Sequence, residues 1–269
     1  RSWLRLGRDM LKHNLHECMT IRPRGPTMHA RTVLLVLTAL GITRSLGAAE
    51  PDATILDKYR VKPATIPGDD LSGDVGPRLL ALLSNRVSRN LGVMEADRKK
   101  ANLEDPHAIV SDGPYFEYFV AGNAYAAGTL VRFGRPGESM AGLSRQELLN
   151  SAVRMIGAVA HDHHLGGGGK RWTRFRSARI VHLLGMAAWL IWEDLDGATQ
   201  LLVARIIEQE ADTFLDRPAP AKLHGDTQAE SNAWTGGGIA VAACMLSSHP
   251  HRTLWAQKAN EYMISAYAT

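Results

Sequence analysis

The stretch GDTQAESNAWTGGG, Gly225 to Gly238, combines residue types that are rarely placed together in one helix. Asn232 is a poor helix-interior residue because its amide competes for backbone hydrogen bonds. It lies on a stripe that is otherwise small or apolar, so the amide needs either a partner or an open face. Trp234 lies roughly 200° further round a helix. We therefore expect one of the two side chains to face a site and the other to pack.

The residues around this pair have simpler explanations as well. Thr227 and Glu230 match the spacing of a capping box, in which Glu230 folds back on the Thr227 amide. Each glycine of Gly236–Gly238 costs about 1 kcal/mol of helix stability relative to alanine. That cost is expected where something bulky approaches the backbone, which is either a ligand or a neighbouring helix.

A second group of reactive side chains surrounds a glycine run in HDHHLGGGGKRWTRFR. His163 and His164 precede the run, and Trp172 and Arg174 follow it. Cations bind carboxylate or sulfate and an indole covers a sugar face, so this loop suits an anionic sugar chain. The alternative is a surface loop after a histidine-rich helix end, where cations suit the helix dipole.

Metal binding by the same histidines is not expected. His161, His163 and His164 do not share one helix face, and only Asp162 is a nearby carboxylate. We predict no metal site and no cofactor. Tyr125 lies in a segment rich in small residues and could line a cleft, although tyrosines there are more often core residues with a satisfied hydroxyl.

Helical patterns dominate after residue 76, and no strand pattern is convincing. Ser144 and Glu147 form a second capping box. Segments with small or uniformly apolar residues alternate with amphipathic segments, which is typical of stacked αα-hairpins in two layers. The fold class predicted is all-α, with stacked antiparallel αα-hairpins forming an incomplete (α/α) toroid. The expected helices are 77–92, 114–133, 144–160, 176–192, 196–215, 227–246 and 251–267.

The beginning of the chain has the pattern of a secretory signal peptide. MHARTVLLVLTALGITRSLGAAE contains a basic residue, an apolar run and small residues before a cleavage site near Ala49. The apolar run is too short to span a bilayer. We assign 1–27 to a non-native upstream extension, 28–49 to the signal peptide, 50–76 to an extended arm and 77–269 to the toroid domain. Because the last helix runs to Thr269 without a capping glycine, we expect truncation there.

Charge and cysteine content exclude other classes. The net charge of +4 comes from residues 1–49, which hold eight Lys/Arg against Asp9 and Glu17, and the remaining 23 basic and 25 acidic residues give −2. The body of the protein is therefore not a basic nucleic-acid binder. Cys18 and Cys244 are the two cysteines, so removal of the leader leaves no internal disulfide, and the core alone must stabilise the exported domain.

The stretch DTQAESNAWTGGGIAVAACMLSSHP resembles the asparagine-bearing inner helix of heparinase II/III-like polysaccharide lyases and related (α/α)-toroid alginate lyases. The shared features are an asparagine near the helix start, small and apolar residues, and a proline-containing turn at His249–Pro250. The resemblance implies that Asn232 neutralises a uronate carboxylate. These families often have histidine after the asparagine, whereas this chain has Ala233. The resemblance therefore does not assign the catalytic base. The families' later tyrosine, histidine and β-sandwich would lie beyond Thr269.

On this resemblance the chain is expected to be a secreted or periplasmic lyase that cleaves uronate-containing polysaccharide by β-elimination. A proton α to the carboxylate is removed, neutral or cationic donors stabilise the growing charge, and a histidine or tyrosine exchanges protons. The candidates are catalytic Asn232, His164 and Tyr125, with Trp234, Trp172, Arg174, Glu230 and His163 binding substrate.

Two alternatives remain open. A glycoside hydrolase on the same helical ring would need two carboxylates, for which Asp226 and Glu230 are the only pair in the stretch. A non-catalytic module binding a glycan or a protein needs neither. The expected partner is an anionic polysaccharide, with no nucleic acid and no stable membrane insertion after signal cleavage, and the oligomeric state stays undetermined.

Overall fold

The computed structural model describes residues 57–62, 75–102, 109, 116–134, 137–168, 172, 174–219 and 228–267, and only the backbone at 174–176, 228 and 267. The chain divides after Ala49, and every described residue lies in the second unit, Glu50–Thr269. The described residues form seven α-helices and no strand, which confirms the all-α prediction. The predicted upstream extension and signal peptide lie outside them.

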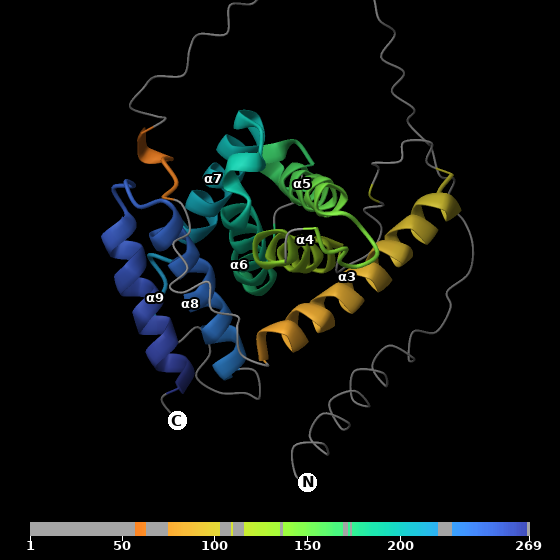
Figure 1. Cartoon of the computed structure of the whole chain (residues 1–269). Helices are drawn as coiled ribbons and strands as arrows, with labels where there is room; N and C mark the ends of the chain where they lie inside the picture. Colours follow the sequence, from red (N-terminus) through yellow and green to blue (C-terminus); the bar gives the residue numbers. More distant parts are fainter. Residues whose placement is uncertain are drawn as a thin grey trace, which may run out of the picture. The chain divides into compact units, whose positions relative to one another are not determined.

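The elements follow the predicted order (Figure 1). Two short 3₁₀ helices, η1 (His164–Gly166) and η2 (Trp192–Asp194), follow α5 and α6. The α-helices are α3 (Val75–Lys100), α4 (Phe116–Phe133), α5 (Arg145–Asp162), α6 (Arg174–Leu190), α7 (Gly197–Asp212), α8 (Gln228–Met245) and α9 (Arg252–Tyr267).

Side-chain caps fix the starts of α5 and α7. Ser144 and Glu147 form the predicted capping box, in which each side chain accepts a hydrogen bond from the other residue's backbone N–H. At α7, the Asp196 carboxylate accepts a hydrogen bond from the Thr199 amide at 2.9 Å. Both caps satisfy N–H groups that have no partner within the helix.

The first helix is longer than predicted. Gly92 was expected to end it, but α3 continues to Lys100 and also includes Val75 and Gly76 from the predicted arm. A glycine ends a helix only where the chain turns away, and the residues after Gly92 are good helix formers. Glu95 supports the extension through ion pairs with Arg98 at 2.7 Å and Lys99 at 3.4 Å.

Three helices, α4, α6 and α8, lie next to one another in a row (Figure 1). They run in the same direction. Gly122 and Gly128 of α4 approach Leu183 and Ala187 of α6 in order, and Ala178 and Gly185 of α6 approach Gly238 and Val241 of α8 in order. Small residues allow this spacing. A Cβ at Gly185 of α6 would lie 2.4 Å from a Val241 methyl group of α8.

The second layer consists of α5, α7 and α9, which return antiparallel to the row. Gly185 of α6 lies near Ile207 of α7, while Ser177, earlier in α6, contacts Glu210, later in α7. α9 packs on α8, and α3 packs on α4 through an Asn90–Asn123 hydrogen bond of 2.6 Å. The described hairpins therefore stack as expected, and closure into a toroid stays a prediction.

The glycine run of α8 has neighbouring helices on two sides. A Cβ at Gly236 would lie 2.8 Å from the Met263 side chain of α9, and one at Gly238 would lie 2.8 Å from the Ala178 carbonyl oxygen of α6. At Gly237 the near neighbour is the His182 imidazole of α6. Helix packing thus accounts for the run.

The short described part of the predicted arm contacts the ends of α6 and α8. The Lys62 amide donates to the Met245 carbonyl at 3.3 Å, and the Trp189 indole donates to the Lys62 carbonyl at 2.6 Å. In the part of the chain that the structure describes, no helix combines the length and apolarity needed to cross a membrane.

Candidate functional site

The row of three helices brings a cation between two aromatic rings. The Arg179 guanidinium carbon lies 3.2 Å from the centre of the Tyr118 ring and 3.8 Å from the centre of the Trp234 ring. The three residues come from α6, α4 and α8, so only the side-by-side packing of these helices can assemble them. All three side chains are half-buried. We call this group the Arg179 site.

Electrostatics at the Arg179 site favour an anionic ligand. Burial lowers the pKa of Arg179, and the charge of Glu230 opposes this effect. Arginine nevertheless stays protonated and presents five N–H donors. Within the described part of the chain, no oxygen accepts a hydrogen bond or ion pair from this guanidinium. Both rings contact the guanidinium, and an arginine so placed can use its N–H donors for bidentate binding of a carboxylate or sulfate.

Of the predicted residues, Trp234 belongs to this site, and Glu230 and Tyr125 lie on the helices that form it. Trp234 packs against Arg179, and Glu230 lies one turn earlier in α8 with an exposed side chain. Thr227, its expected capping partner, lies outside the described residues. Tyr125 is half-buried and follows Tyr118 by seven residues, which places both on one face of α4.

Asn232 and Trp234 lie on different sides of α8, as their spacing predicts. Trp234 is half-buried beside Arg179, whereas Asn232 has no exposed surface. A residue that binds a substrate carboxylate must contact it. The catalytic role of Asn232 therefore stays a prediction, and the buried side chain offers no surface to a substrate.

The histidine loop forms a separate group on the other face of α6. His163 Nε2 lies 3.0 Å from Glu210 of α7, and Ser177 of α6 donates a short hydrogen bond to the same carboxylate. Ser177 and Arg179 are two residues apart and so point to opposite sides of the helix. The structure does not bring the two predicted groups together.

The described rings of this histidine group contact neighbouring groups. His163 Nδ1 accepts from the Leu165 amide at 3.3 Å, which leaves the proton on Nε2 to donate to Glu210. The Trp172 ring packs edge-on against His163 with centroids 4.6 Å apart, and His164 lies 2.8 Å from the Gln209 amide. Because His163 is fully buried, we interpret this group as stabilising the fold. The side chain of Arg174 lies outside the described residues.

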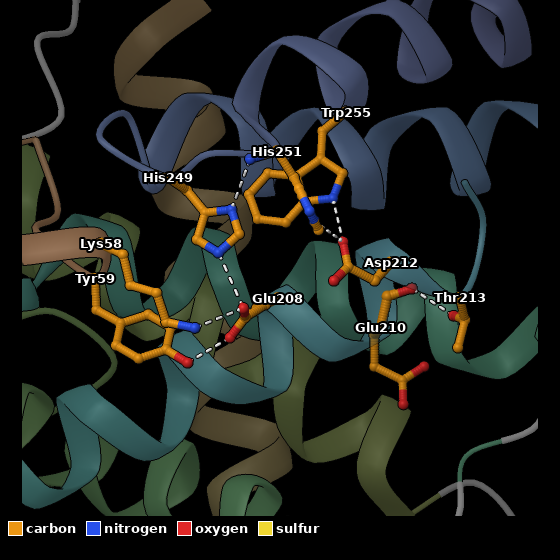
Figure 2. Close-up of polar contacts among 9 residues, drawn as sticks. All are labelled: Lys58, Tyr59, Glu208, Glu210, Asp212, Thr213, His249, His251 and Trp255. Atoms are coloured by element: carbon orange, nitrogen blue, oxygen red, sulfur yellow. Dashed lines mark hydrogen bonds and ion pairs between the residues drawn. The ribbon is translucent and has the colours of Figure 1, made fainter. Parts of the chain in front are cut away.

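A third polar group was missed by sequence reasoning (Figure 2). Glu208 of α7 accepts from Lys58 and His249, each at 2.9 Å, and from the Tyr59 hydroxyl. One turn later, Asp212 accepts from the Trp255 indole at 2.8 Å and contacts His251 at 3.0 Å. The available signal was the pair of carboxylates at i and i+4 opposite two histidines that flank Pro250.

Titration in this third group follows its hydrogen bonds. Burial by itself would raise the pKa of Glu208, but donors from Tyr59, Lys58 and His249 outweigh it, and the pKa is lowered. Burial lowers the pKa of His249, which Glu208 only partly offsets. Burial and the bond to Glu208 raise the pKa of Tyr59. Through Lys58 and Tyr59 these contacts hold the 57–62 segment on α7.

The described residues contain no group of three or more His, Cys, Asp or Glu side chains that could hold a metal ion. No protein-family model, no curated protein and no solved structure significantly matches the chain.

Proposed function

We propose that this protein is a polysaccharide lyase-like protein that binds uronate-containing polysaccharide at the Arg179 site and cleaves it by β-elimination. One observation carries the proposal. A guanidinium is clamped between Tyr118 and Trp234 with its N–H edges unpaired within the described part of the chain. A half-buried cation without an acceptor is best explained by an anionic ligand.

The chemistry of a uronate fits this arrangement. Removing the proton next to the carboxylate moves charge onto the carboxylate, and a fixed cation stabilises that charge in the transition state. The two rings hold the guanidinium in place before substrate binds, which reduces the entropy lost on binding. The charge of Glu230 acts on Arg179 without an ion pair between them, so the guanidinium stays available to a substrate carboxylate.

The same proposal includes a cellular location and a fold. Export to the periplasm or the medium would place the protein where such polysaccharides occur, and it rests on the signal-peptide pattern of residues 28–49. The parallel row of α4, α6 and α8 supports the toroid, because that architecture repeats such hairpins around a ring.

Binding without cleavage is the second candidate. It is favoured by the complete burial of Asn232, since the expected neutralising amide has no accessible surface. A glycoside hydrolase would need two carboxylates beside the substrate. Among the described residues, Glu230 is the carboxylate coupled to Arg179, and Asp226 lies outside them.

The proposal is tested by adding uronate and neutral polysaccharides to the full chain. Binding is measured by calorimetry, and cleavage by the ultraviolet absorbance of the unsaturated uronate product. Arg179→Gln should weaken uronate binding about ten- to hundredfold, which corresponds to losing roughly 1.5–3 kcal/mol from charged hydrogen bonds.

Arg205→Gln is the matched control, because Arg205 is an exposed arginine on α7. It should bind as the unmodified protein does. Binding of uronate polymers that is unchanged in Arg179→Gln would refute the assigned site. Binding without the ultraviolet product would leave the second candidate, and release of new reducing ends without it would indicate hydrolysis.

A further inference from the structure

We infer that His182 is the proton-accepting residue of the Arg179 site and that Gly237 is required to admit its ring. This inference rests on the proposed function and extends it to a residue for which the sequence patterns gave no role. His182 interrupts an apolar run, RIVHLLGMAAWL, in α6, the middle helix of the row.

The position of His182 connects it to the Arg179 site. It follows Arg179 by three residues on α6, and Gly237 follows Trp234 by three residues on α8, so each pair lies on one helix face. Arg179 contacts Trp234, and His182 contacts Gly237 one turn further along. The two helices thus present the cation and the imidazole side by side.

Gly237 explains how the imidazole fits against α8. A Cβ added at Gly237 would lie 2.8 Å from His182 Nδ1 and 3.3 Å from its Cε1. Real Cβ contacts are almost never that short, so any other residue at this position would move the ring. Gly236 and Gly238 contact other groups, Met263 and Ala178, so the effect on His182 is specific to Gly237.

His182 also differs from the other described histidines in its partners. Its Nδ1 is buried and has no hydrogen-bond partner among the described residues, while the side chain as a whole is half-buried. A buried polar atom without a partner calls for a reason. In the described part of the chain, Trp172 Nε1, Ser231 Oγ and Tyr262 Oη are buried without a partner too, so for His182 the reason comes from its place one turn after Arg179. By contrast, the other described histidine rings contact a polar atom of Gly166 (His161), Glu210 (His163), Gln209 (His164), Glu208 (His249) and Asp212 (His251).

The chemical step balances without a further reagent. The second ring nitrogen, Nε2, takes the proton from the carbon next to the uronate carboxylate. The electron pair of that C–H bond forms a carbon–carbon double bond, and the bond from the adjacent carbon to the glycosidic oxygen breaks. The oxygen leaves with the electron pair of the broken carbon–oxygen bond and takes a proton from water. The hydroxide that forms takes the proton from His182 Nε2, which restores water and the neutral imidazole. Arg179 stabilises the carboxylate charge during the step, and Glu230 of α8 is the described carboxylate coupled to that cation.

Substitution separates this role from binding. His182→Gln keeps a polar side chain of similar length but cannot accept the proton. It should lose at least about 100-fold in elimination rate, as expected for removal of a general base, while its uronate affinity stays within about threefold, well under the tenfold that 1.4 kcal/mol represents.

Gly237→Ala tests the same residue from the opposite helix. It should also lose elimination by displacing the ring, whereas Gly157→Ala on α5, where a Cβ meets nothing within 4 Å, should keep it. Circular dichroism verifies that each variant is folded.

Histidine side-chain NMR gives a readout that does not depend on turnover. Adding a uronate oligosaccharide to the unmodified protein should shift the His182 ring signals, while the buried His163 and His249 signals serve as internal references. His182→Gln removes the shifting signal and so assigns it.

The outcomes distinguish this inference from the proposed function. Cleavage at an unchanged rate in His182→Gln overturns the inference and leaves the proposed function standing. Binding by the unmodified protein without any cleavage also overturns it. If the unmodified protein neither binds uronate nor shows a shift at His182, both fall. Loss of cleavage with retained binding and a shifted His182 signal supports both.

Discussion

At the scale of single residues, the close contact between α6 and α8 depends on glycines, which have no side chain. Gly238 lies against the backbone of α6, where a Cβ would be 2.8 Å from the Ala178 carbonyl oxygen. A backbone oxygen cannot rotate away as a flexible side chain can. The helices would therefore have to separate to accept even a methyl group at this position.

Gly238→Ala should therefore lower the free energy of unfolding by about 1–3 kcal/mol, the usual range for overpacking. Gly157→Ala is the matched change, because the same methyl group enters open space in a helix interior. It should raise the free energy of unfolding by about 0.5–1 kcal/mol. Urea denaturation of both variants checks the pair, and equal effects in both would show that α6 and α8 are further apart than described.

Histidine 163 and histidine 249 illustrate how partners decide a residue's role. In both, Nδ1 accepts from the backbone N–H two residues later, and Nε2 faces a glutamate of α7. An indole packs on each ring. Spacing alone singled out His163 as a substrate contact, but its saturation by Glu210 could not be foreseen, because Glu210 is 47 residues away.

At the scale of elements, α7 ties residues 57–62 to the helical stack through Glu208. The pKa values of Glu208 and His249 are lowered in the folded protein. Their contribution to stability is therefore present at pH values above the ordinary pKa of each group, and it is lost as the pH falls through the lowered pKa. The pKa values of Lys58 and Tyr59 are raised, so their contribution is lost only as pH rises through alkaline values. The attachment should hold best near neutral pH.

Glu208→Gln should release this segment at neutral pH, because one change weakens the contacts with Lys58, Tyr59 and His249 together. Hydrogen exchange of the Lys62 amide, which donates to Met245, should lose at least about tenfold of its protection, equivalent to 1.4 kcal/mol.

Asp212→Asn is the control for that change. It alters the contacts with His251 and Trp255 one turn away and should leave the Lys62 amide protected. In the unmodified protein, the same protection should fall on acidification. A Lys62 amide that is equally protected in Glu208→Gln and at acid pH would contradict the role of Glu208.

The helices could be predicted from the sequence, whereas the site could be predicted only in part. Six of the seven ranges lie close to the observed bounds, because caps and apolar periodicity are local signals. The end of α3 was wrong, since Gly92 is a weak stop without a turn after it. Trp234 was identified, but Tyr118 and Arg179 meet it only through packing between helices more than 50 residues apart.

At the scale of the whole molecule, the division after Ala49 separates the leader pattern from the helical unit. The buried hydrophobic cluster described for the chain runs from Leu80 to Tyr262 and so belongs to the second unit. Stability comes mainly from burying such a core. From the division after Ala49 we predict that the helical unit folds without residues 1–49.

A chain of residues 50–269 should unfold at the same temperature as the full chain, within about 2 °C, a shift that corresponds to less than 1 kcal/mol for a domain of this size. Thermal unfolding followed by circular dichroism measures both, and the helical signal should be retained. Its uronate binding should also match, because Tyr118, Arg179 and Trp234 all lie in this unit. A lower unfolding temperature for the shorter chain would mean that residues 1–49 contribute to the fold, which a cleaved leader does not.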